Sequence, residues 1–149
     1  MTNRAYTKAM NRIEKYLTDR GFTVNLNSNT FGFFEEEDLV TCASRAEGTL
    51  SMICGFLHEA GHAISAPSTF ADLRPSNKRD RVMVAELEYK AWEEGWKLAK
   101  RLKITFPELE DQYRKDWMRF WNTYLDALYT QTKRSVIKEI AYNYTPESE

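Results

Sequence analysis

Two histidines, the only two among the 149 residues of this chain, constrain its fold more than any other feature. They stand at positions 58 and 62, inside the segment 56–64, FLHEAGHAI. On a helix, side chains four positions apart lie one above the other, so His58 and His62 can bind a single ion while Glu59 lies beside it. The segment therefore predicts a helix that carries the metal-binding pattern His-Glu-x-x-His.

The surrounding sequence indicates that this helix has a buried face. Apolar or small residues recur at helical spacing: Leu50, Ile53, Leu57, Gly61 and Ile64. Pro67 ends this run of residues. Residues 44–47, SRAE, precede the run and have the form of a capping box, which marks the start of a helix. We therefore expect both histidines to lie on one helix between these two signals.

The pattern suits zinc in particular. Zinc binds neutral imidazole nitrogens at roughly 2.0–2.1 Å, prefers a tetrahedral shell, and in catalytic sites keeps one position for water beside three protein ligands. The pKa of the bound water falls to about 7, and a neighbouring carboxylate can take its proton as hydroxide attacks a carbonyl. Glu59 is placed to be that general base.

Composition excludes several other classes of protein. With 42% hydrophobic residues, the chain can form one domain with its own core over residues 1–149. A net charge of −1 gives no reason to expect nucleic acid or an anionic membrane as a partner. The sequence contains neither an apolar run long enough to span a membrane nor a signal-peptide core after Met1, so we expect a cytoplasmic protein.

The two cysteines do not point to a disulfide framework or to a zinc site of their own. Cys54 stands one turn before His58, however, so its thiol could share the face of the two histidines. We interpret Cys54 as a buried, inert thiol and keep a ligand role as the alternative.

The first 43 residues predict a helix and a small sheet. A helix over residues 3–20 ends at Gly21. Residues 22–26 and 30–34 have strand character around a turn at 27–29, and residues 38–43 can form a third strand after a charged turn. We therefore expect an α+β fold, mostly helical, with a short two- to three-stranded antiparallel sheet next to the histidine helix. An exposed edge of that sheet could bind an extended peptide.

Two further helices are predicted after the loop that follows Pro67. One runs from about Lys78 to Lys103, and the last starts near Pro107. The last helix carries an aromatic stripe that we interpret as core: Tyr113, Trp117, Phe120, Trp121, Tyr124 and Leu128. A basic cluster is interpreted as solvated, with selection of an acidic substrate as the alternative: Arg74, Lys78, Arg79 and Arg81.

A third metal ligand must be a carboxylate, because no histidine remains. The extended motif HExxHxxGxxH fails, since Ser65 and Ser68 stand at its glycine and third histidine. Five acidic residues follow within reach: Asp72, Glu86, Glu88, Glu93 and Glu94. Glu88 falls on the apolar stripe of its helix, where an unpaired carboxylate is costly, whereas Glu86 and Glu93 fall on the opposite side. We therefore predict Glu88 as the ligand, with Glu86 and Asp72 as alternatives.

The segment 58–62, HEAGH, followed on the next helix by 88–95, EYKAWEEG, resembles the gluzincin-type zinc metallopeptidases, in particular the small ImmA/IrrE-like proteins of phages and mobile elements. The resemblance covers roughly residues 39–102. It implies zinc bound by His58, His62 and Glu88, with Glu59 as general base, in a cytosolic peptidase domain. The helix-turn-helix pattern of some relatives is not evident here, and no third histidine is left to stabilise an oxyanion.

Three hypotheses follow from these residues. The first is a zinc metallopeptidase that hydrolyses a peptide or protein substrate with Glu59 as base. The second is a catalytically silent zinc protein, or a phage-type protein that binds a partner with the same fold. The third is an iron site formed by two histidines and one carboxylate, which ranks last because it gives Glu59 no role.

Overall fold

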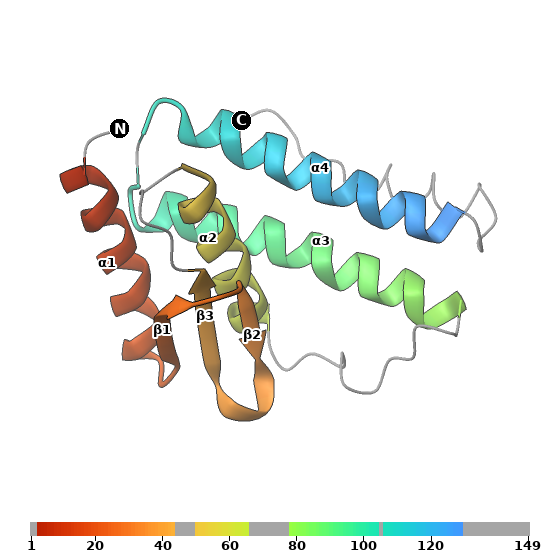
Figure 1. The fold of residues 1–149 in the computed structure, drawn as a ribbon, viewed down its shortest axis with the longest axis horizontal. Helices are drawn as coiled ribbons and strands as arrows, with labels where there is room; N and C mark the ends of the chain where they lie inside the picture. The colour runs from red at the N-terminus through yellow and green to blue at the C-terminus, as the bar shows by residue number, and fades with distance from the viewer. Residues whose placement is uncertain (1–2, 44–49, 66–77, 105, 130–149) are drawn as a thin grey trace.

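The computed structural model describes residues 3–43, 50–65, 78–104 and 106–129 (Figure 1). In chain order the elements are α1 (Asn3–Asp19), β1 (Thr23–Ser28), β2 (Gly32–Phe34), the short 3-10 helix η1 (Glu35–Glu37), β3 (Leu39–Ala43), α2 (Leu50–Ser65), α3 (Lys78–Arg101) and α4 (Leu109–Tyr129). The predicted α+β fold, mostly helical with a small sheet, is confirmed. The helix with the two histidines is α2.

Helix α2 is the centre of the fold. It packs against α1, against β2 and β3, and against α3 and α4 (Figure 1). Most of its length is buried: Met52, Ile53, Cys54, Phe56, Leu57, His58, Glu59, Ala60, Gly61, His62 and Ala63. Because almost the whole circumference of α2 is buried, α2 is a core helix. Its polar residues must therefore find partners inside the protein.

Two glycines bring α2 and α3 into close contact. A side chain at Gly61 would collide with the backbone carbonyl of Ala91, and one at Gly95 would collide with the carbonyl of Leu57. The two contacts are reciprocal, since each helix supplies one glycine and one carbonyl. Gly61 lies inside the histidine motif, so the tight crossing occurs where the site residues stand.

The sheet is mixed, and the prediction of an antiparallel sheet is wrong in this respect. Its order is β1-β3-β2, with β3 antiparallel to β2 and parallel to β1. The expected hairpin between residues 22–26 and 30–34 does not form, because β3 lies between those strands. The burial pattern explains the order: β3 is buried from Val40 to Ala43, whereas β1 alternates between exposed and half-buried residues. The most buried strand takes the central position, where both of its edges are paired.

The helix boundaries agree closely with the predicted ones. Gly21, with φ of 90°, turns the chain after α1, and Lys103, with φ of 54°, does so after α3. Helix α4 begins at Leu109, two residues after Pro107. The predicted capping box at 44–47, Asp72, Arg74 and the side chains of 78–81 lie outside the described residues. None of the helices that the structure describes is both long and apolar enough to cross a membrane.

Candidate metal centre

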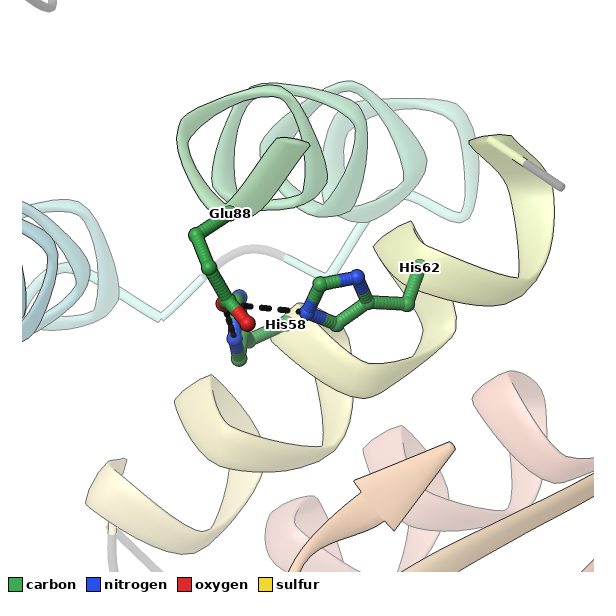
Figure 2. A group of neighbouring side chains, drawn as sticks. All are labelled: His58, His62 and Glu88. Atoms are coloured by element: carbon green, nitrogen blue, oxygen red, sulfur yellow. Dashed lines mark hydrogen bonds and ion pairs between the residues drawn. The ribbon is translucent and has the colours of Figure 1, made fainter. Parts of the chain in front are cut away.

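Three predicted side chains meet between α2 and α3. His58 and His62 project from successive turns of α2, and Glu88 reaches them from α3 (Figure 2). The Nε2 atoms of both histidines lie 3.0 Å from Oε2 of Glu88. The structure thus brings together the residues expected as ligands, and within its described part Glu86, Glu93 and Glu94 do not join the group.

The close crossing of α2 and α3 explains why Glu88 reaches the histidines. Ala91, whose carbonyl lies against Gly61, stands three residues after Glu88 on α3. Side chains three positions apart share a helix face, so contact at Ala91 directs Glu88 toward the turn of α2 that carries both histidines. The glycine inside the motif therefore positions the third carboxylate.

The donor set fits a metal ion. In a tetrahedral shell with ligands at roughly 2.0–2.1 Å, neighbouring donor atoms lie roughly 3.3 Å apart. The nitrogen and oxygen atoms of this site are 3.0 Å apart, and all three candidate ligand atoms fall within 4.8 Å of one another. His58, His62 and Glu88 could therefore hold one metal ion after a small outward adjustment.

The electrostatics of the group favour the protonation states that a metal requires at Glu88 and His58, but not at His62. Burial alone would raise the pKa of Glu88, but its hydrogen bonds to His58 and His62 and their charges outweigh burial and hold this pKa well below its usual range. Burial lowers the pKa of His58. The carboxylate therefore stays ionised and the His58 imidazole stays neutral, as ligands must. Burial alone would lower the pKa of His62, but its hydrogen bond to Glu88 and the charges of Glu88 and Glu59 raise it, so a metal ion would have to displace a proton from this imidazole.

Glu59 lies beside the ligands without being one of the group. It is buried, 9% exposed, and its Oε1 is 3.8 Å from Nε2 of His58. Burial, reinforced by the charge of Glu88 and opposed by that of His62, raises the pKa of Glu59 to about 7. A carboxylate with a pKa near neutrality is suited to accept and return a proton.

Tyr124 on α4 belongs to the site and was not assigned to it from the sequence. Its hydroxyl donates a hydrogen bond to Oε2 of Glu88 over 3.1 Å. Burial and the charge of Glu88 raise its pKa, so the hydroxyl remains a donor. Helical spacing placed Tyr124 on the aromatic stripe of α4, and that stripe was interpreted as core. The stripe gives no signal that separates Tyr124 from Tyr113, which has the same polar hydroxyl.

Trp92 on α3 forms one wall beside the histidines. Its ring stacks on the ring of His58 with centroids 4.1 Å apart and an angle of 21°. Nδ1 of His58 is buried and has no hydrogen-bond partner among the described residues. The orientation of this imidazole therefore depends on stacking with Trp92 and on the contact of its Nε2 with Glu88.

Cys54 is buried, as we interpreted it, and does not join the ligand group. Burial is also the main cause that raises the pKa of its thiol, with a further contribution from the charge of Asp116. Burial likewise raises the pKa of Cys42 to about 12. Both side chains are free thiols that fill the core.

A cavity of about 330 Å³ opens next to the ligands. Its lining includes His58, Glu59 and Glu88, and α4 contributes a further part of it. Aromatic rings form much of the lining: Phe31, Trp92, Phe120 and Tyr124. A substrate that occupied this cavity would touch both Glu59 and the place where a metal ion fits.

Comparison of this chain with models of protein families, with curated proteins and with solved structures gives no match. The likeness to gluzincin-type metallopeptidases therefore stays a prediction from residues 58–62 and 88–95.

Proposed function

We propose that this protein is a zinc-dependent metallopeptidase in which His58, His62 and Glu88 bind the metal and Glu59 is the general base. The observation that carries the proposal is that the buried Glu59, whose pKa is raised to about 7, lines the same open cavity as His58 and Glu88 of the three-donor metal group. A site that only stabilises the fold has no need of such a carboxylate or of such a cavity.

Each residue has a distinct task in this proposal. His58, His62 and Glu88 would hold the zinc ion, which would supply an acidified water and a Lewis acid for the carbonyl of the scissile bond. Glu59 takes the proton of that water and delivers it to the leaving amine. Trp92 holds the ring of His58 by stacking, and Tyr124 holds the carboxylate of Glu88 by its hydrogen bond.

The substrate in this proposal is an extended peptide or protein segment. Strand β2 pairs with β3 on one side and forms an edge of the described sheet. Phe31, which directly precedes β2, lines the cavity, so the edge and the metal group border the same space. A peptide that added to this edge by main-chain hydrogen bonds would pass Glu59.

A catalytically silent protein that binds a partner is the alternative. The observation that favours it is the exposure of Phe31 at 37% and Phe120 at 40%, since exposed aromatic rings are typical of interaction sites. In that case the metal group would stabilise the fold, and the partner would cover the aromatic rings.

Zinc content and peptide cleavage separate these two functions. We expect one zinc per chain after purification without added metal, and loss of that zinc in His62→Ala. Glu59→Gln should keep the zinc and the fold but cleave a proteome-derived peptide library at least about 10²-fold more slowly. Absence of any cleavage by the wild type, with Glu59→Gln behaving identically, would favour the silent alternative. Full zinc in His62→Ala would refute the metal site itself.

A further inference from the structure

The part of the cavity lining that comes from α4 contains a buried carboxylate with capacity for a further partner. Asp116 on α4 is only 5% exposed and lines the cavity. Its Oδ1 accepts a hydrogen bond from Nε2 of Gln112 over 2.9 Å. No donor among the described residues contacts its Oδ2 by a hydrogen bond. Because Oδ2 is not among the fully buried polar atoms that lack a partner, it reaches the space of the cavity and can accept a further cationic or donor group there.

The surroundings of Asp116 are aromatic. Phe120 stacks on Trp92 with ring centroids 5.6 Å apart, and Trp92 in turn stacks on His58. On the other side, the ring of Phe31 covers Gly55 so closely that a side chain at Gly55 would collide with it. A long aliphatic chain that lay between these rings would lose apolar contact with water and gain contact with ring faces.

Arg119 already makes the two contacts that such a cavity offers to a cation. Its guanidinium lies 3.8 Å from Oδ1 of Asp116 and 5.2 Å from the ring centroid of Phe120. The side chain is nevertheless 69% exposed, and neither distance is that of a close contact. Surface pairs of this kind contribute little, so a cation delivered from within the cavity can replace Arg119 at low cost.

We infer that this cavity is a specificity subsite for a lysine or arginine side chain of the substrate. The aliphatic stem lies between Phe31 and Phe120, and the cationic end pairs with Asp116. This inference rests on the proposed peptidase function, since it assigns a substrate class to the same site. It also selects against acidic side chains, which Asp116 and Glu59 would repel.

Binding of small hydroxamates tests the inference without requiring turnover. The probes are acetohydroxamate, which has no side chain, and the hydroxamates of arginine, norleucine and glutamate. Their affinities for the zinc-loaded protein are measured by calorimetry. We expect arginine hydroxamate to bind about tenfold or more tightly than norleucine hydroxamate, because a buried carboxylate gains a charged partner.

Two variants and a matched control assign that preference to Asp116. Asp116→Asn should reduce the arginine-to-norleucine ratio to about one and leave the norleucine affinity unchanged. Asp111→Asn makes the same substitution at an exposed position of α4, outside the cavity lining, and should keep the ratio. Arg119→Ala, at an exposed position, should keep or increase the ratio because it removes the competing guanidinium.

Each remaining outcome overturns a defined part of the proposal. Equal affinity for the arginine and norleucine probes in the wild type refutes the subsite while the peptidase proposal stands. Preference for the glutamate probe, lost in Arg119→Ala, shows that Arg119 selects anions instead and also refutes it. Failure of all four hydroxamates to bind the zinc-loaded protein shows that the metal has no open coordination position, which refutes the proposed peptidase function and the subsite with it.

Discussion

Two tyrosines of α4 both contact α3, but one is buried in the core and the other borders the cavity. Tyr113 and Tyr124 stand eleven residues apart, close to three helical turns, so they share a face. The hydroxyl of Tyr113 donates to the backbone carbonyl of Trp92, and that of Tyr124 donates to the carboxylate of Glu88. Tyr113 is 1% exposed, whereas Tyr124 borders the cavity.

The difference shows how one helix pair both stabilises the fold and builds a site. Around Tyr113 the helices pack closely, since a side chain at Gly95 would collide with the Tyr113 hydroxyl and the Leu57 carbonyl. The Tyr113 ring also packs against those of Trp92 and Trp96. Around Tyr124 the same helices leave a cavity beside three candidate ligands. Contacts at the first tyrosine should therefore determine stability, and contacts at the second should determine metal affinity.

The largest effect is expected at the carboxylate that Tyr124 holds. Glu88→Ala removes one of three proposed ligands, so zinc affinity should fall enough for a chelator to strip the metal, and the melting temperature should lose its dependence on zinc. Competition against a zinc chelator and thermal unfolding with and without metal measure both effects.

Glu86→Ala is the matched control for that measurement. Glu86 points about 200° away from Glu88 around α3, so its removal should leave the zinc affinity near that of the wild type. If Glu86→Ala released zinc and Glu88→Ala retained it, the assignment of the third ligand would be wrong.

A smaller effect is expected from Tyr124→Phe. The substitution keeps the ring and removes the hydrogen bond to Glu88, so the carboxylate is oriented less well toward the metal. Loss of such an outer partner lowers metal affinity about 10–100-fold. The chelator competition should show this shift while the metal-free protein unfolds at nearly the wild-type temperature. An unchanged zinc affinity would mean that Tyr124 does not position Glu88.

The metal group could be predicted from sequence because it depends on local periodicity. The spacing of His58 and His62 and the position of Glu88 on an apolar stripe are properties of single helices. Tyr124 and Asp116 were missed because periodicity places residues on a face without showing where that face meets a cavity. Both tyrosines fit the stripe of α4 equally well, and only the packing of α2 and α3 distinguishes them.

The order of the sheet could not be predicted for a related reason. Residues 22–26 and 30–34 are adjacent in sequence and have strand character, which favours a hairpin. The structure instead inserts β3 between them, because burial of Val40 to Ala43 against α2 requires the central position. The order of the strands depends on which segment takes the central position against α2. No local pattern in the sequence encodes that outcome.

The smallest effect is expected from Tyr113→Phe, and it should be the reverse of that of Tyr124→Phe. The substitution keeps the stacked ring and removes one buried hydrogen bond, so the free energy of unfolding should fall by about 0.5–1.5 kcal/mol. Zinc affinity should not change, because Tyr113 donates its hydrogen bond to a backbone carbonyl and not to one of the three candidate ligands. Urea unfolding of the metal-free protein measures the first quantity, and chelator competition measures the second. Should Tyr113→Phe weaken zinc binding as much as Tyr124→Phe does, the two ends of α4 would be coupled, and the division between a stabilising tyrosine and a positioning tyrosine would be wrong.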